Sequence, residues 1–184
     1  MINKKTNRGF TLIETLISVL LLATALTGPM TIASRSLNTT LVAKDQIIAY
    51  YLAQDAVEYV RFIRDSNRLG SLSWLSGLDG TANGHTSITG AGCVNTTDGC
   101  VVDSLDDTIT SCTGVCTGLK FNTSTGSYNT SGTGLPGFTR TIKITTPIGT
   151  NADEASLTVT ITWTDIGGIV HPGVTMKENL FNWQ

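Results

Sequence analysis

The stretch Arg8-Gly9-Phe10-Thr11-Leu12-Ile13-Glu14 opens an apolar segment that continues to Leu26. Lys4 and Lys5 precede it, and no acidic residue does. Positive charge before an apolar segment holds that end in the cytoplasm, so the rest of the chain is directed outward. As a helix, the segment from Phe10 to Leu26 reaches about 25 Å, the lower limit for a bilayer span. We therefore expect the helix to continue past Leu26.

Glu14 is a carboxylate one helical turn into this apolar segment. A charge in hydrocarbon costs on the order of 2.5 kcal/mol or more unless it has a partner. Cleavage between Gly9 and Phe10 would create an ammonium four residues before Glu14, in the same chain or in a neighbouring copy. The alternative is that Glu14 snorkels to the lipid headgroups. Pairing between copies would make assembly the way to satisfy the carboxylate.

The sequence Gly9-Phe10-Thr11-Leu12-Ile13-Glu14 behind a short basic leader resembles the prepilin signal of the type IV pilin superfamily. This superfamily comprises pilins, minor pilins, type II secretion pseudopilins and competence pseudopilins. The resemblance implies cleavage after Gly9 by a prepilin peptidase, N-methylation of Phe10, and a role for Glu14 in assembly. It also implies an inner-membrane assembly platform and a filament core made of the apolar helices. A broader likeness to V-type minor pilins extends to about Asn67.

An ordinary secretory signal is the alternative for the N-terminal segment. Ala23-Thr24-Ala25 fits its small-residue cleavage site. Glu14 argues against it, because a signal that is removed gains nothing from a charge in its apolar core. Either signal exports the bulk of the chain.

The pattern divides the chain into a leader over residues 1–9, a transmembrane or filament-core helix over 10–29 and an extracytoplasmic head over 30–184. Gly28-Pro29 is the expected helix break, because proline removes an amide donor and clashes with the preceding turn. In the superfamily a helix-breaking residue in this neighbourhood is associated with local unwinding on assembly. A passive bend is the alternative.

The head is predicted to contain an amphipathic helix over 30–67, a loop region over 70–136 and an antiparallel sheet over 137–184. Residues 138–145 and 157–163 alternate apolar and polar, and a last strand over 169–181 is interrupted by Pro172. A sheet covering the apolar face of the helix gives an α+β class, the pilin fold. That helical face has the members Leu41, Ile48, Leu52, Ala56, Tyr59 and Ile63.

Four cysteines lie in the loop region. In an oxidising compartment they predict two disulfides, with three possible connectivities. Sequential pairing is preferred because each loop then closes locally, and a zinc site is the alternative, with spacings that suit it poorly. The cysteines are Cys93, Cys100, Cys112 and Cys116.

Two further surface features accompany the cysteines. An acidic cluster could hold calcium, as some pseudopilins do, but it lacks the spacing of an EF-hand, so solvated acids are favoured. Sequons for N-linked sugar are present, and in so threonine-rich a sequence such matches arise by chance. The acids are Asp98, Asp103, Asp106 and Asp107, and the sequon residues are Asn38, Asn95, Asn122 and Asn129.

Composition argues against enzymatic and nucleic-acid functions. Charged residues make up 14% of the chain, and without residues 1–9 nine Lys and Arg face fourteen Asp and Glu, which gives no basic face for nucleic acid. His85 and His171 lack metal-ligand spacing, and no P-loop, dinucleotide fingerprint or nucleophile elbow occurs. We expect no catalytic residue, no metal and no cofactor.

The resemblance thus implies a structural filament subunit, a minor pilin first of all, that serves adhesion, motility, DNA uptake or secretion. It would be a single-pass membrane protein before assembly and part of an extracellular filament afterwards. A type II secretion or competence pseudopilin is the nearest alternative. A second alternative is a membrane-anchored adhesin that forms no polymer and contacts a ligand through residues 71–135.

Overall fold

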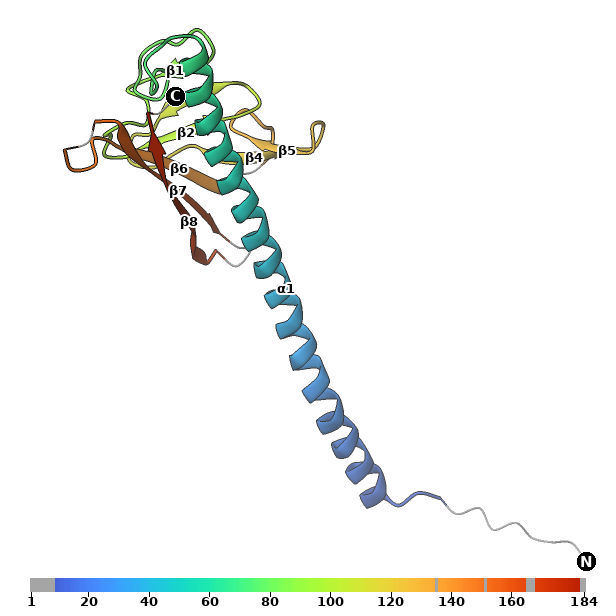
Figure 1. Cartoon of the computed structure of the whole chain (residues 1–184). Helices are drawn as coiled ribbons and strands as arrows, with labels where there is room; N and C mark the ends of the chain where they lie inside the picture. The colour runs from blue at the N-terminus through green and yellow to red at the C-terminus, as the bar shows by residue number, and fades with distance from the viewer. Residues whose placement is uncertain (1–8, 135, 151, 165–167, 183–184) are drawn as a thin grey trace, which may run out of the picture. The chain divides into compact units, whose positions relative to one another are not determined.

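The computed structural model describes residues 9–134, 136–150, 152–164 and 168–182, so the leader residues 1–8 lie outside it. The chain divides into two compact units, Met1–Ala43 and Lys44–Gln184. One helix, α1 (Leu12–Leu69), contributes to both units, as its continuous ribbon in Figure 1 shows. The second unit contains all the described strands.

Helix α1 begins two residues later than the expected start at Phe10 and ends two residues beyond the expected Asn67. It runs through Gly28 and Pro29 without a melted turn, and the unwinding on assembly that the resemblance implies stays a prediction. Pro29 removes only one backbone hydrogen bond, and the long helical segments on both sides tolerate that loss.

The buried face of α1 starts later than the periodicity predicts. Leu41 is 48% exposed, and Ile48 is the first residue of the predicted stripe that packs against the core. Alanines dominate the N-terminal part of this face, and their small side chains let the sheet approach the helix backbone closely. The buried residues are Ala49, Ala53, Ala56, Val57, Tyr59, Val60, Ile63 and Asn67.

The described residues contain eight strands in one sheet, in which β6 (Pro136–Thr145) pairs with β2, β4 and β7. The sheet order is β1-β3-β2-β6-β4-β5, and β7 joins β6 to β8. The other strands are β1 (Ser87–Thr89), β2 (Cys100–Asp103), β3 (Thr108–Ser111), β4 (Gly118–Asn122), β5 (Ser127–Asn129), β7 (Glu154–Thr164) and β8 (Val170–Phe181).

The region 70–136 is more ordered than the predicted loop region, since it holds β1 to β5. β6, β7 and β8 pair antiparallel, as predicted for residues 137–184. β1 pairs with β3 in parallel, so the sheet as a whole is mixed. Strands β1 to β5 are three to five residues long, which is too short to show an alternating pattern.

Strand β8 continues through Pro172, where an interruption was expected. Among the described strands β8 pairs only with β7, and an edge strand tolerates the missing proline donor. The pairing shifts register between Ile161 and Trp163, opposite this point. Gly173 has φ +82°, and a Cβ there would lie 2.1 Å from the carbonyl oxygen of Ile161. Glycine is therefore required for the strand to pass this bulge.

The inward-facing residues of β6 and β7 form the core with the buried face of α1, which confirms the α+β class. Burial alternates along β7, so every second residue from Ala155 to Trp163 faces the core. Arg140 occupies one of the inward positions of β6 and is 1% exposed. It is the only charged residue besides Asp103 in the buried set of the described chain.

Arg140 joins three elements at the centre of the head. Its Nη1 donates to the carbonyl of Leu52 at 3.1 Å and to the Asp55 carboxylate at 2.7 Å, both on α1. Its Nη2 donates to the carbonyl of Val102 on β2. Ser104 donates to both carboxylate oxygens of Asp55 at 3.0 Å. A buried guanidinium with these acceptors fixes the helix against the sheet.

Because the Tyr59 hydroxyl is buried, we expect the folded chain to lose stability at alkaline pH. Burial, and then the charge and hydrogen bond of Asp107, raise the pKa of Tyr59 in the folded chain. An unfolded tyrosine ionises near pH 10, so above that pH the unfolded state gains the free energy of ionisation and the folded state does not. We expect full stability below pH 10 and a loss of up to about 1.4 kcal/mol per pH unit above it. Urea unfolding of the full chain in detergent between pH 8 and 11 measures this slope.

Tyr59→Phe is the control, since it keeps the ring and removes the titrating group. The slope above pH 10 should decrease in this variant, although burial also raises the pKa of Tyr128, which retains its contribution. An unchanged slope in Tyr59→Phe would contradict the assignment.

Candidate functional site

The N-terminal segment meets α1 in a short non-helical lead. Gly9, Phe10 and Thr11 belong to neither a helix nor a strand, and all three are exposed. The side chain of Phe10 is 83% exposed. The peptide bond between Gly9 and Phe10, the predicted cleavage site, therefore lies before the first turn of α1 (Figure 1).

Thr11 caps the helix. The backbone N–H of Glu14 donates to the Thr11 hydroxyl at 3.3 Å and to the Thr11 carbonyl at 3.1 Å. The N–H of Thr15 donates to the same carbonyl at 3.2 Å. Threonine is a favoured N-cap residue, and Thr-x-x-Glu is the sequence of a capping box. These bonds explain why the helix starts at Leu12.

Glu14 is the third residue of α1 and the acidic residue of its first turn. Its carboxylate makes no hydrogen bond or ion pair with any residue in the described part of the chain. The positive end of the helix dipole favours a carboxylate at this position, but it supplies no counter-ion. The predicted assembly residue is thus an exposed charge next to a long apolar surface.

The hydroxyl groups that follow Glu14 are, in contrast, satisfied within the helix. Each donates to a backbone carbonyl three or four residues earlier, at distances between 2.7 and 3.1 Å. Such bonds remove the cost of a polar side chain in hydrocarbon. The residues are Thr15, Ser18, Thr24, Thr27, Thr31 and Ser34.

The apolar side chains of this part of α1 are exposed. Among the described residues, α1 is the helix that is long and apolar enough to cross a membrane. The large apolar side chains from Phe10 to Ile32 are 51 to 83% exposed, so no element of the same unit covers them. A membrane or other helices must cover this surface in water.

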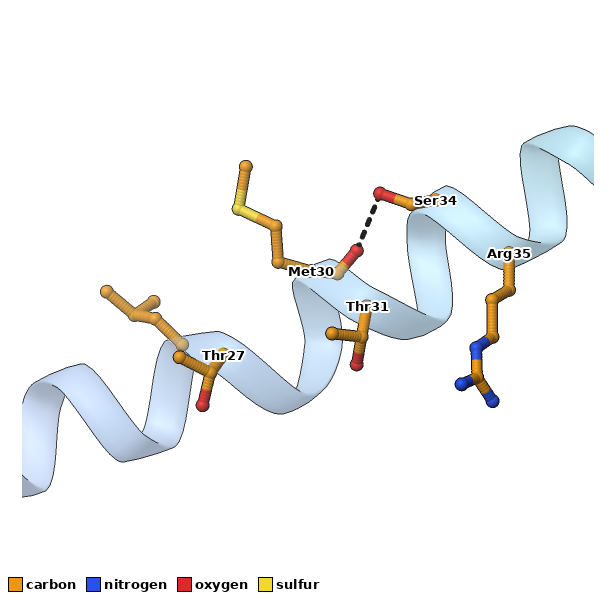
Figure 2. Close-up of a pocket in the computed structure, with 6 residues that line it drawn as sticks. Thr27, Met30, Thr31, Ser34 and Arg35 are labelled. Carbon is orange, nitrogen blue, oxygen red and sulfur yellow. Dashed lines mark hydrogen bonds between the residues drawn. The ribbon is translucent and has the colours of Figure 1, made fainter. Parts of the chain in front are cut away.

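A shallow groove lies on the same segment. It is lined by Leu26, Thr27, Met30, Thr31, Ser34 and Arg35. Figure 2 shows that all of the labelled side chains come from one stretch of α1, and that the Ser34 hydroxyl is bonded to the Met30 carbonyl. Because a single helix forms it, the groove is a surface for packing and not an enclosed site.

Residues 4–28 match the family model described as the prokaryotic N-terminal methylation motif. This segment is a prepilin-type signal. Type IV pilins and pseudopilins carry such a signal, so the match confirms the resemblance drawn from Gly9 to Glu14. Comparisons with curated proteins and with solved structures found no match.

The prepilin-type signal implies processing by a prepilin peptidase and assembly with other subunits in a membrane-anchored filament. It marks structural, pilin-like proteins and not enzymes. Together with the apolar helix it fits a membrane-anchored protein. It does not distinguish a minor pilin from a pseudopilin.

Downstream of the prepilin-type signal, the cysteines form the sequential pairs Cys93–Cys100 and Cys112–Cys116. This confirms the preferred connectivity and leaves no thiolate for the alternative zinc site. The first disulfide lies in the main core, where both cysteines are fully buried. The second is attached to a smaller cluster around Val101 and Leu119. The disulfides therefore restrain the region that was predicted to be a loop region.

The acidic residues near the cysteines do not converge on one point. Asp98 accepts from the N–H of Gly114, and Asp106 accepts from the hydroxyl of Ser131. Asp107 accepts a hydrogen bond from the hydroxyl of Tyr59. Asp103 accepts from the backbone N–H and the hydroxyl of Thr130 at 2.7 and 2.8 Å. In the part of the chain that the structure describes, no group of three or more His, Cys, Asp and Glu could hold a metal ion.

The sequon asparagines are mostly engaged. The side chain of Asn95 donates to the carbonyl of Thr146, and that of Asn122 accepts from Ser124. Asn129 is 5% exposed, and Asn38 lies within α1. Glycosylation at Asn129 would require its side chain to leave this buried position.

Proposed function

We propose that this chain is a structural subunit of a type IV pilus or related filament, and specifically a minor pilin. It is cleaved between Gly9 and Phe10, methylated on the Phe10 amine and assembled through α1. A type II secretion or competence pseudopilin is the nearest alternative, since both carry the same signal. This function needs no catalytic residue and no cofactor.

The observation that carries the proposal is the state of Glu14. The six hydroxyls from Thr15 to Ser34 are bonded to their own helix, so the Glu14 carboxylate is the polar side chain in the apolar segment that needs a partner from elsewhere. Cleavage supplies one, because the new ammonium of Phe10 lies just before the helix. Since Phe10 lies outside α1, its amine can reach a neighbouring copy. An ion pair between copies lowers the cost of both charges in the membrane.

The head supports a structural role. The Cys93–Cys100 disulfide ties the preceding loop to β2, and the Cys112–Cys116 disulfide closes the loop between β3 and β4. Arg140 connects β6 to β2 and to α1. A head of this kind can face outward from a filament whose core consists of apolar helices. The proposed partners are therefore other pilin subunits, the prepilin peptidase, the inner-membrane assembly platform and the membrane itself.

Mass spectrometry of the native N-terminus tests the proposal. We expect a mature chain that starts at Phe10 and carries an N-methyl group, because the scissile bond lies in the exposed, non-helical lead. The cysteines serve as an internal control, since both disulfides should be intact in the same sample. A chain that starts at Leu26, as an ordinary secretory signal predicts, would contradict the proposal.

A further inference from the structure

We infer that Thr11 is a positioning residue for the cleavage of the Gly9–Phe10 bond: its hydroxyl caps α1 and thereby keeps the scissile bond out of the helix. This inference rests on the proposed function, because it concerns the same processing step. Thr11 is not proposed to take part in the reaction itself.

The backbone of Glu14 shows how the cap works. In a helix extended backward by two residues, the N–H of Glu14 would donate to the carbonyl of Phe10, four residues earlier. In this structure the N–H donates to the hydroxyl and the carbonyl of Thr11 at 3.3 and 3.1 Å. The Thr11 hydroxyl thus competes directly for the donor that would otherwise draw Phe10 into the first turn.

The environment strengthens this competition. An apolar solvent favours every backbone hydrogen bond that can form, so lipid would extend α1 toward Gly9. A side-chain acceptor at the N-cap satisfies an otherwise free N–H and ends the helix there. Leu12 and Ile13 follow the cap, and neither side chain could replace its oxygen.

Peptide hydrolysis needs a free carbonyl at the scissile bond. Water adds to the carbonyl carbon of Gly9, the bond to the Phe10 nitrogen breaks, and the amine leaves with a proton. Enzymes stabilise the developing oxyanion with hydrogen-bond donors. In the described part of the chain no N–H is bonded to the Gly9 or the Phe10 carbonyl. Within a helix the Gly9 carbonyl would accept from the N–H of Ile13 and would be withheld from the enzyme.

The test compares Thr11→Val, which keeps the branched shape and removes the acceptor, with Thr11→Ser, which keeps the hydroxyl. Each full-length chain is treated with purified prepilin peptidase in detergent, and the mature product is followed by mass. Loss of an N-cap predicts a decrease of about five-fold in kcat/KM for Thr11→Val and a normal value for Thr11→Ser. Carbonyl carbon chemical shifts of Gly9 and Phe10 should move toward helical values in Thr11→Val alone.

Equal cleavage of Thr11→Val and the wild type would overturn this inference and leave the proposed function intact. So would slow cleavage of both variants, since the hydroxyl that Thr11→Ser retains would then not be enough for normal cleavage. An uncleaved wild-type chain would overturn the proposed function and this inference together. Extraction of each variant from membranes, with both disulfides formed, shows that the chains are inserted and folded.

Discussion

Replacement of Glu14 by glutamine is expected to remove the chain from filaments while its amount in the membrane stays the same. Glutamine has the shape of glutamate but no charge, so insertion into lipid becomes easier and not harder. What is lost is the attraction for the Phe10 ammonium of a neighbouring copy. The Phe10 ammonium of the neighbouring copy is then left without a partner. An unpaired charge in the membrane costs on the order of 2.5 kcal/mol, which corresponds to a decrease of about 60-fold in assembly.

The measurement is the ratio of this subunit in purified filaments to that in membranes, with antibody against the head. Ser18→Ala is the matched control, because Ser18 lies one turn further along the same helix and donates only to the carbonyl of Glu14. We expect Ser18→Ala to assemble normally. If Glu14→Gln entered filaments as well as the wild type, the assembly role of Glu14 would be contradicted. If the wild type itself were absent from filaments, the chain would behave as an anchored adhesin and the proposed function would be lost.

The prepilin-type signal, the fold class and the disulfide pairing could be predicted from the sequence, because each depends on residues that lie close together in it. The match to the prepilin-type signal follows from a short motif, and the α+β class follows from the periodicity of α1, β6 and β7. The disulfide pairing followed from loop closure over seven and four residues. In each case the deciding contacts lie close together in sequence.

The features that could not be predicted depend on contacts between distant residues. The parallel pairing of β1 with β3 joins Ser87 to Thr108, and nothing in either segment indicates its partner. The late start of the buried stripe after Leu41 depends on where the sheet ends. Two signals were nevertheless readable: Thr11-x-x-Glu14 has the sequence of a capping box, and Arg140 stands at an inward-facing position of an alternating strand. An arginine at such a position requires acceptors from another element.

Asp55 supplies the second large effect, although its side chain is 44% exposed. Asp55→Ala is expected to lower the free energy of unfolding by about 3 kcal/mol, because it leaves the guanidinium of Arg140 buried without a counter-ion. The carbonyls of Leu52 and Val102 accept from Arg140 but carry no charge. Urea unfolding of the full chain in detergent, at constant pH, measures the change.

Asp65→Ala is the matched control. Asp65 is also a helical aspartate and pairs with Arg64 at 2.8 Å, but Arg64 is 18% exposed where Arg140 is 1%. Water can solvate the Arg64 guanidinium once Asp65 is removed. We therefore expect Asp65→Ala to lower the free energy of unfolding by about 0.5 kcal/mol or less. The double variant Asp55→Ala with Arg140→Met should be more stable than Asp55→Ala alone, because it removes the unpaired buried charge and keeps most of the volume. If Asp55→Ala and Asp65→Ala had equal effects, Arg140 would not depend on the carboxylate of Asp55. The carbonyls of Leu52 and Val102 would then be sufficient to hold the guanidinium between α1 and β2.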